Sequence, residues 1–463
     1  MKTKTLIKDF RKGIVLSAVV ASVTCAATAN ATEHTAGIDA NGTHLTVDGG
    51  DIFTVNPSAG AYALRARANG SIAIDPSGQG ITINYASAEN PGTSSAYLVH
   101  ANNGSINLGT GTAITSYHAD DVSNAYNLYA LNGGTITVNS GLIINQTGSA
   151  ARAVMASTDS FIDLGVGASI SVDYIGISTG GTGGVLAESA TITSRNYTAV
   201  TGSPGSSITL INCDSMGYVY GASMQIGTTL EIAPPATVLN ITGGTVRSQT
   251  NSAIAVNDNA KTLASSGIIN ISAGAKIYSG NGVAVDNESF ITLSGGLLTI
   301  NIEGADTEVN GRILDGINAV TDVNITNSAA WVSEGSSTMD SLTLDNANIN
   351  FTFTATDDAI TVGEMSTSGS SDVTINFSND FLNDITDGFV FDTDDAIIVG
   401  SGEKDNINYI VLGQNKDGST WDISDNGDGT YTITNINVVP EPATYAAIFG
   451  ALALALAIYR RRK

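Results

Sequence analysis

Cysteine, tryptophan, proline and basic residues are all scarce in this chain. Its 463 residues include 2 Cys, 2 Trp, 8 Pro and 19 Lys plus Arg, and only 13% of all residues are charged. So low a charge does not suit long exposed helices, whose polar faces are rich in Lys and Glu. Because 42% of the residues are hydrophobic, the chain can bury a core, which excludes wholesale disorder.

The two cysteines exclude an intrachain disulfide in the body of the chain. Cys25 lies close to the N-terminus, within an apolar stretch that resembles an export signal, and this leaves Cys213 alone. Cys213 follows the strand-like run Leu210-Ile211-Asn212, so we expect a buried thiol rather than a reactive one.

Positive charge is confined largely to the two ends. Without residues 1–31 and 438–463, the chain keeps 41 acidic and 10 basic residues, a net charge of −31. A body of this charge is repelled by phosphate backbones and by anionic lipid. Nucleic acid is therefore excluded as a partner.

The N-terminal segment 1–31 has the pattern of a secretory signal peptide. Basic residues extend to Lys12, residues 14–23 are apolar, and Ala29-Asn30-Ala31 forms a small-x-small cleavage site. We expect cleavage after Ala31 by the export machinery; the alternative is a retained helix at the membrane interface.

The C-terminal segment 438–463 has the pattern of a membrane span. Pro440, Glu441 and Pro442 interrupt regular structure, and the 17 residues from Ala443 to Tyr459 carry no charge. A helix of that length reaches about 25 Å, enough to cross a bilayer core with flanking side chains at the interfaces. The span is followed by a cluster that should stay cytoplasmic: Arg460, Arg461, Arg462 and Lys463.

This arrangement resembles the PEP-CTERM sorting signal of bacteria with a Gram-negative type of envelope. The resemblance covers the last 26 residues and implies recognition of Pro440, Glu441 and Pro442 by an exosortase. It further implies transient anchoring in the inner membrane, processing near these residues, and release to the cell surface or an exopolysaccharide matrix. A permanent single-span anchor is the alternative.

Between its ends the sequence repeats itself. The block at Ala61–Ala66 recurs at Ala125–Ala130 and Ala151–Ala156, and a copy one residue shorter begins at Ala96. Each block has two short alternating runs separated by a corner of Gly, Asn or Asp, which tolerate the positive φ of tight turns. Irregular spacing of this kind predicts an all-β, right-handed parallel β-helix with interior columns of Ile, Leu and Val. Antiparallel β-sandwich repeats are the rival fold.

We expect the β-helix over residues 32–355 and a small β cap over 356–437. Within the cap, Trp421–Ser424 and Thr430–Thr434 flank the turn-forming run Asp425–Gly429, which predicts a hairpin. A cap would keep the open end of the solenoid from pairing with other chains.

A further motif lies near the end of the helix region. Trp331 precedes the Ser-rich turn Ser333–Ser337 and the Leu342-Thr343-Leu344 strand. This looks like the last coils of pertactin-like autotransporter passenger domains. The resemblance implies the shape of the body and not the self-export of those proteins.

The sequence offers no catalytic, cofactor or metal motif. The four histidines lack metal-binding spacing, and His100 occupies a variable repeat position expected to face solvent. The run from Asp422 begins like a calcium loop, but its twelfth position is Ile433 instead of Glu, so we interpret it as a turn. We therefore expect a non-enzymatic, structural or adhesin-like surface protein. The alternative is a secreted carbohydrate-active β-helix enzyme, either a polysaccharide hydrolase or a lyase.

Mass spectrometry of the exported protein tests both terminal signals. We expect Thr32 at the N-terminus and a C-terminal cut near Pro440–Pro442. Recovery of the uncleaved chain from the cytosol would contradict both signals, whereas an exported chain that still ends at Lys463 would favour the permanent anchor.

Overall fold

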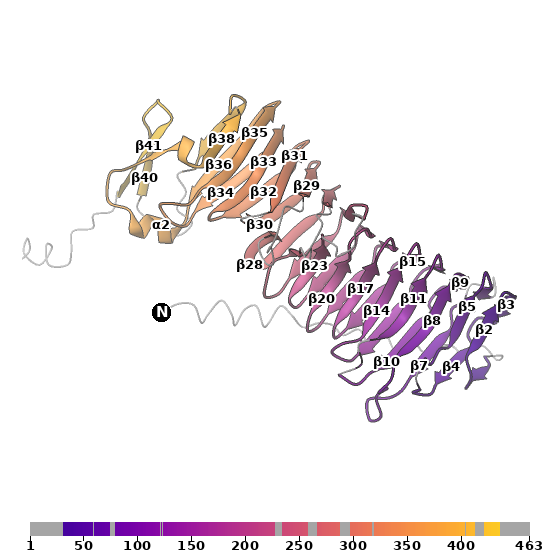
Figure 1. The fold of residues 1–463 in the computed structure, drawn as a ribbon. Coiled ribbons are helices and arrows are strands. Elements are labelled where there is room, and N and C mark those ends of the chain that lie inside the picture. Colours follow the sequence, from indigo (N-terminus) through magenta and orange to yellow (C-terminus); the bar gives the residue numbers. More distant parts are fainter. Residues whose placement is uncertain are drawn as a thin grey trace, which may run out of the picture.

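The computed structural model describes residues 31–58, 60–74, 79–120, 122, 124–226, 234–257, 266–287, 297–316, 319–402, 404–412 and 421–435. These residues form an elongated all-β molecule, a right-handed parallel β-solenoid with almost no helix. Figure 1 shows its coils stacked along the molecule from the N-terminal to the C-terminal end. The β-helix prediction is thus confirmed, and the rival β-sandwich is wrong.

Each N-terminal coil contributes one strand to each of three parallel ladders. Ladder 1 runs in this order: β1 (Glu33–His34), β4 (Ile52–Val55), β7 (Thr82–Tyr85), β10 (Ala113–Tyr117), β13 (Ile143–Thr147), β16 (Ser169–Val172), β19 (Thr191–Ser194), β22 (Asp214–Gly217) and β25 (Thr245–Ser248). Ladder 2 runs beside it: β2 (Ile38–Asn41), β5 (Leu64–Arg67), β8 (Ala96–Asn102), β11 (Ala125–Leu131), β14 (Arg152–Ser157), β17 (Ile175–Gly180), β20 (Thr198–Gly202), β23 (Tyr220–Gln225) and β26 (Ile254–Asn257).

Ladders 1 and 2 merge at β28 (Lys276–Asn287). The first half of this strand pairs with β25 and the second half with β26. The merged ladder continues as β30 (Glu308–Asp315), β32 (Ala330–Glu334), β34 (Asn348–Phe353), β36 (Ser371–Phe377) and β39 (Ile407–Val411). Each coil therefore changes from three strands to two at this point.

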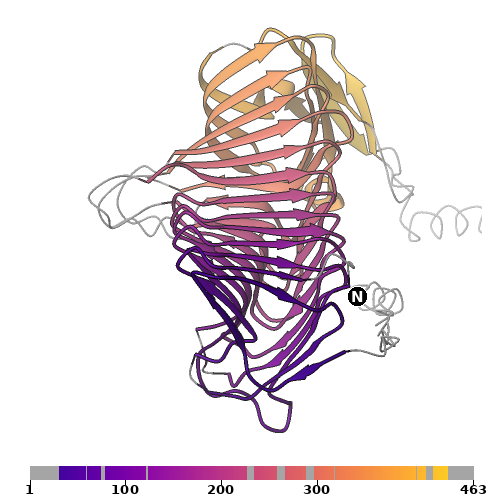
Figure 2. The ribbon, with the colours of Figure 1, turned by 90° about the vertical axis from the view of Figure 1, so that its right-hand side faces the viewer.

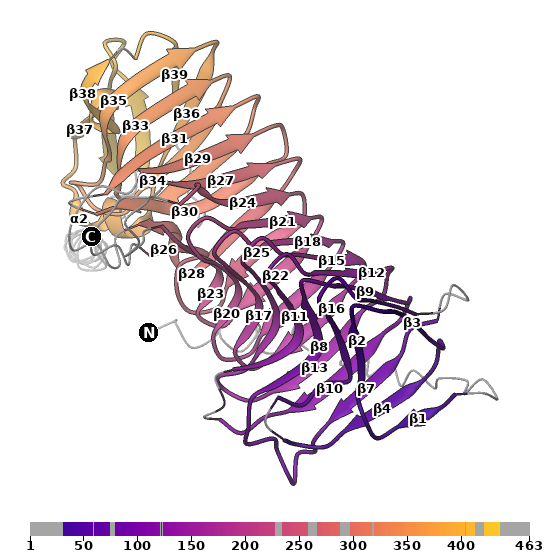
Figure 3. The same cartoon turned by 45° about the vertical axis from the view of Figure 1, so that its right-hand side comes forward.

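Ladder 3 runs the whole length of the solenoid and forms the row visible in Figure 3. Its strands are β3 (His44–Val47), β6 (Ser71–Ile74), β9 (Ser105–Leu108), β12 (Thr135–Val138), β15 (Phe161–Val166), β18 (Gly184–Glu188), β21 (Ser207–Ile211), β24 (Thr237–Thr242), β27 (Gly267–Ser272), β29 (Leu297–Glu303), β31 (Val320–Thr326), β33 (Ser337–Asp345), β35 (Ile360–Ser368) and β38 (Ile397–Gly402).

The repeat blocks lie directly over one another. Ala61 pairs with Ala96, and Ala96 pairs with Ala125. In the next coil Tyr126 pairs with Arg152, so the block at Ala151 follows in the same register. The spacing of the repeats in the sequence therefore predicted their vertical alignment correctly.

The interior is built of apolar columns. One column on ladder 3 contains, in successive coils, Ile72, Ile106, Ile136, Ile162, Val185, Ile208, Leu239, Ile269, Ile300, Val323, Leu342 and Met365. Every member is buried, and neighbours lie one strand spacing, about 4.8 Å, apart. Burial of such side chains contributes about 1.5–3 kcal/mol each, which gives the coils a shared core.

Simple alternation fails on ladder 2. Leu98 and Val99 are both fully buried although they are adjacent, and the same holds for Asn127 and Leu128 in the next coil. When two consecutive residues point inward, the residue before the pair and the residue after it both point outward. Ladder 2 therefore presents two outward columns at positions i and i+3.

The corner glycines have two different roles. Asn132 and Gly133 adopt positive φ, as the sequence indicated for corners. Gly134 does not, yet a Cβ there would lie 2.1 Å from the carbonyl oxygen of Ala101 in the coil below. Glycine is needed at position 134 because the backbones of two coils approach closely there. A rule that looks for positive φ at corners would not identify this requirement.

Asparagines form a ladder on the outer surface of ladder 3. Asn324 donates to Asn301 at 2.9 Å, Asn301 to Asn270 and Asn270 to Asn240, both at 2.8 Å. Asn240 in turn donates to the hydroxyl of Thr209 at 3.1 Å. Asn301, Asn270 and Asn240 thus each use one donor and one acceptor along the solenoid axis.

The parallel ladders extend beyond residue 355, the position at which we predicted that the β-helix ends and the cap begins. β35, β36, β38 and β39 continue the coils up to Val411. The C-terminal end also carries α2 (Asn379–Asp384), the 3-10 turn η1 (Thr393–Asp395) and an antiparallel sheet of β37 (Phe389–Asp392), β41 (Thr430–Asn435) and β40 (Trp421–Asp425). Figure 2 shows this sheet in yellow beside the last coils. The predicted hairpin is present as β40 and β41.

Substitution of the corner glycines should separate their two roles. Gly134→Ala should lower the free energy of unfolding by about 1–3 kcal/mol, because its methyl group would overlap backbone atoms of the coil below. Gly133→Asn is the matched control and should be nearly neutral, since no atom lies within 4 Å of its Cβ and Asn tolerates positive φ. Urea unfolding measures both; equal effects would contradict the close-approach role.

Candidate functional site

The sorting residues predicted from the sequence lie mostly outside the described residues. The residues outside the described part of the chain are Ala29, the Pro440–Pro442 motif, the span Ala443–Tyr459 and the basic cluster Arg460–Lys463. Ala31 is described and is exposed. Among the residues that the structure describes, no helix combines the length and the apolar character needed to cross a bilayer.

A cluster of aromatic and basic side chains occupies the outer surface of ladder 2 near the N-terminal end. We call it the aromatic face and define it as Tyr62, Arg65, Tyr97, His100, Tyr126, Tyr129, Arg152 and Met155. Its two columns are those created by the paired inward residues of each coil. Its strands β5, β8, β11 and β14 lie side by side in Figure 1.

The rings of the aromatic face are packed against one another across two coils. The centroids of Tyr126 and Tyr129 lie 4.8 Å apart with an interplanar angle of 14°. Tyr97 lies 5.8 Å from Tyr126 and 5.3 Å from Tyr129, again stacked. His100 stacks on Tyr129 at 5.2 Å. The parallel register makes this stacking possible, because Tyr97 pairs with Tyr126 and His100 with Tyr129.

Guanidinium groups border the ring stack on both sides. Arg65 pairs with His100 in register and lies over the ring of Tyr62 at 4.1 Å. On the other side, Arg152 follows Tyr126 in the next coil. The Nε atoms of both arginines are buried and have no hydrogen-bond acceptor. The face therefore places guanidinium groups beside rings that are partly buried or, at Tyr126, buried.

Arg65 also belongs to an ion-paired group at the N-terminal edge of the face. Asp39 accepts hydrogen bonds from Arg65 at 2.6 Å and from Arg67 at 2.9 Å. The hydrogen bond from Arg65 is the largest cause that holds the pKa of Asp39 below its ordinary value. One carboxylate thus neutralises only part of the local positive charge.

Burial governs the titration of the rings. It lowers the pKa of His100 to about 4, and the neighbouring Arg65 acts in the same direction. Burial also raises the pKa values of Tyr126 and Tyr129. His100 lies on the outer surface, as expected, but its ring is largely covered because it packs between Tyr97 and Tyr129. His100 is therefore a neutral ring at neutral pH.

A second aromatic pair continues along the same side of the solenoid. Tyr174 and Tyr197 precede β17 and β20 and stack at 4.6 Å. Beside them Arg195 donates to Asp173 at 2.6 Å. Tyr197 is 38% exposed, so this pair is more open than the main cluster.

The sequence contained a signal for this face that our interpretation missed. The Tyr at the second position of the repeat block and the Arg, His or Tyr three residues later recur in three coils. Once the strand register between coils is known, the two recurring positions can be recognised as two columns on the same surface. Without the paired inward residues, positions i and i+3 of a strand would be placed on opposite faces.

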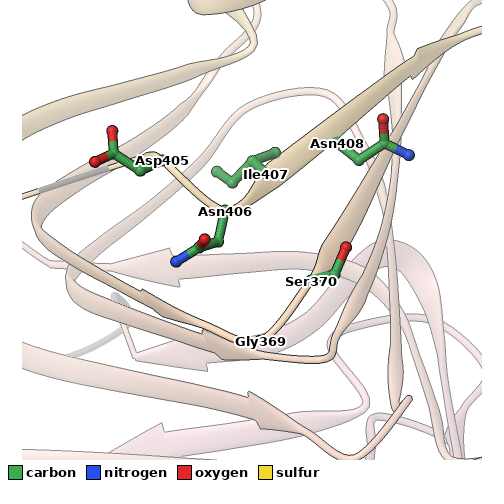
Figure 4. A pocket seen from close by; sticks show the side chains of 6 residues that line it. All are labelled: Gly369, Ser370, Asp405, Asn406, Ile407 and Asn408. Carbon is green, nitrogen blue, oxygen red and sulfur yellow. The ribbon is translucent and has the colours of Figure 1, made fainter.

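Two shallow pockets lie at the other end of the molecule. The first, of about 290 Å³, is lined by Gly369, Ser370, Asp405, Asn406, Ile407 and Asn408 (Figure 4). The second, of about 350 Å³, is lined by Val332, Glu334, Asn350, Thr352, Asn376, Phe377, Ser378 and Asn379. Each contains one carboxylate, whereas acid–base hydrolysis of a glycosidic bond uses two.

The remaining predicted residues have structural roles. Cys213 is buried and donates to the carbonyl of Ala187, and burial raises the pKa of its thiol, as expected for an unreactive cysteine. Trp331 is fully buried and donates to the carbonyl of Gly311 at 2.9 Å. The described residues contain no cluster of three His, Cys, Asp or Glu side chains suited to a metal.

The chain matches no protein-family model and no curated protein sequence. Its class is defined by its own structure: a parallel β-solenoid with an aromatic and cationic face over its N-terminal coils.

The buried state of His100 predicts a pH dependence of stability. An unfolded histidine has a pKa of about 6.5, above the value of about 4 in the folded chain. Between these values the unfolded state binds more protons, so stability should fall as the pH is lowered from about 6.5 to about 4. His118, whose pKa burial also lowers to about 4, should contribute in the same window.

His100→Tyr keeps an aromatic ring at the position that Tyr129 occupies one coil later, and it removes one titrating group. Urea unfolding at several pH values should show a shallower slope for this variant than for the wild-type chain. Equal slopes, or ring resonances of His100 that titrate near pH 6.5 in NMR spectra, would contradict the buried neutral ring.

Proposed function

We propose that this chain is an exported surface or matrix protein that binds an acidic polysaccharide through its aromatic face. Its terminal signals support export and processing by an exosortase, with the body outside the inner membrane and finally at the cell surface or in an extracellular matrix. The observation that carries the binding proposal is the ring stack of Tyr97, Tyr126 and Tyr129 between Arg65 and Arg152.

Sugar rings pack against aromatic side chains, and carboxylates of a uronate-type polymer would pair with the guanidinium groups at both sides of the stack. The columns follow the solenoid axis, so an extended chain has successive contacts in successive coils. Weak contacts of this kind add up because they are linked in one polymer. The acidity of the rest of the body repels such a polymer, so the contact has to be local to this face.

The C-terminal antiparallel sheet supports a capping role. Phe391 of β37 packs edge-on against Phe353 of β34 at 4.9 Å and against Phe377 of β36 at 5.3 Å. An open coil end would expose unpaired strand groups and apolar side chains to other chains. We propose that this sheet and α2 protect the last coils.

A hydrolase function is less well supported. Asp315 and Asp340 lie close together, and Thr321 donates a hydrogen bond to each of them. Glycosidases hold their two carboxyl groups about 5 Å or more apart so that the bond to be cleaved fits between them. Asp315 and Asp340 are instead both engaged by Thr321, so this pair is a poor candidate for that reaction.

Affinity electrophoresis in gels that contain polygalacturonate or neutral dextran tests the binding proposal with the full exported chain. We expect retardation by polygalacturonate and three- to tenfold weaker binding for Tyr129→Leu, since an aromatic contact contributes about 0.5–1.5 kcal/mol beyond its buried area. Arg152→Gln should reduce the preference for polygalacturonate over dextran.

Tyr278→Leu is the matched control, because Tyr278 is 38% exposed and lies on β28, away from the aromatic face. It should bind like the wild-type chain, and circular dichroism should show all variants folded. Absence of retardation in both gels, or equal losses for Tyr129→Leu and Tyr278→Leu, would refute the proposal.

A further inference from the structure

The positive charges of the aromatic face are widely spaced along the solenoid axis. Arg65 lies on β5 and Arg152 lies on β14, and the strands β8 and β11 of two further coils lie between them. Three strand spacings therefore separate the two guanidinium positions, about 14 Å along the axis. The face thus carries its charge at its two borders and not along its length.

The two coils between these borders contribute only neutral side chains to the face. They are Tyr97 and His100 on β8 and Tyr126 and Tyr129 on β11. A tyrosine is neutral at pH 7, and His100 is neutral there because burial lowers its pKa to about 4. A ligand carboxylate placed over these two coils would therefore lie on rings, without a cationic partner.

Each border of the face keeps a positive charge. Arg65 and Arg67 share the single carboxylate of Asp39, which leaves one net positive charge at the N-terminal border. At the other border, Arg152 forms no ion pair with any carboxylate of the described residues. Both borders can therefore bind an anionic group.

The coils that follow Arg152 add rings but no net charge. Tyr174 and Tyr197 stack at 4.6 Å on the same side of the solenoid, and Arg195 beside them is paired with Asp173 at 2.6 Å. The strands β17 and β20, which continue ladder 2 here, contain no Lys, Arg, Asp or Glu. Along the axis, a cationic position is thus followed by two neutral aromatic coils, a second cationic position and a further neutral surface.

This pattern discriminates between two kinds of acidic polymer. In a homopolymer of uronate every sugar carries a carboxylate, so a chain along the face would press several carboxylates against neutral rings. A carboxylate that loses water there without a partner costs free energy, and the acidic body repels it further. A neutral sugar in the same place packs against a ring without that cost.

We propose that the ligand is a heteropolysaccharide in which neutral sugars separate the uronates. Its neutral sugars pack on the tyrosine rings, and Arg65 and Arg152 each bind a carboxylate. This inference rests on the proposed polysaccharide function and adds the charge spacing of the polymer to it. Specificity comes partly from the unpaired carboxylates that a more densely charged polymer would bury on the face.

Affinity electrophoresis of the full exported chain tests the charge spacing, in gels that contain equal concentrations of sugar residues. Hyaluronan alternates a uronate with a neutral N-acetyl sugar, whereas every sugar of polygalacturonate is a uronate. We expect hyaluronan to bind about two- to fivefold more tightly than polygalacturonate, a difference of the size that one exposed charge interaction produces.

His100→Arg should shift this preference towards polygalacturonate, because it places a cation on one of the two neutral coils. The position accommodates Arg, since Arg65 occupies it one coil earlier. We expect a gain of about two- to fivefold for polygalacturonate, the contribution of one exposed ion pair, and a smaller gain for hyaluronan. Thr135→Arg is the matched control, because Thr135 is exposed on β12 of ladder 3 and the variant adds the same charge. It should leave the ratio of the two affinities unchanged, and circular dichroism should show both variants folded.

Two outcomes would overturn the charge spacing and leave the binding of an acidic polysaccharide intact. The first is wild-type binding to polygalacturonate that is as tight as binding to hyaluronan. The second is an equal gain for polygalacturonate in His100→Arg and Thr135→Arg, which would mean that only net charge matters. Absence of retardation by either polymer would instead contradict the proposed function itself, and the charge spacing with it.

Discussion

The vertical register between coils is the constraint on which the rest of this structure depends. Each coil must place its Ile, Leu and Val side chains directly over those of the coil before, as the column from Ile72 to Met365 does. A shift by one residue along a strand would turn the apolar set outward and expose it to water. The differences in repeat length are therefore insertions and deletions at the corners, outside the strands. The copy at Ala96 keeps the strand register of Ala125 and loses its residue at the corner, where Asn103 and Gly104 stand opposite Asn132–Gly134.

The same register determines the outer surface. Side chains in one column are held about 4.8 Å apart, a distance at which rings stack, amides bond and opposite charges pair. The aromatic face, the asparagine ladder through Asn270 and the ion pair of Asp39 with Arg65 are three results of this one rule. Function on a solenoid thus depends on columns more than on clefts. The polysaccharide that we propose as the ligand has the extended shape that matches such a column.

The change from three strands to two at β28 is the other decisive feature. It breaks the regular column pattern and leaves a corner where Asn287 and Asp315 are hydrogen-bonded to Thr321. Polar groups gathered at an irregularity cost stability unless something satisfies them. The aromatic face lies in the regular N-terminal coils, away from this joint.

The sequence by itself determined the solenoid, the alignment of the blocks at Ala61, Ala96, Ala125 and Ala151, the burial of Cys213 and the hairpin after Trp421. Each of these follows from a local pattern, because apolar periodicity and turn residues act within a few positions of the chain. Tertiary structure alone decided that Tyr126 and Tyr129 share one face, that Gly134 stands against another backbone, and that His100 is enclosed by rings. It also brought Asp315 to Asp340. Most of these contacts join residues of different coils. The shared face of Tyr126 and Tyr129, which lie in one strand, depends instead on two adjacent inward residues between them, an arrangement that simple alternation does not predict.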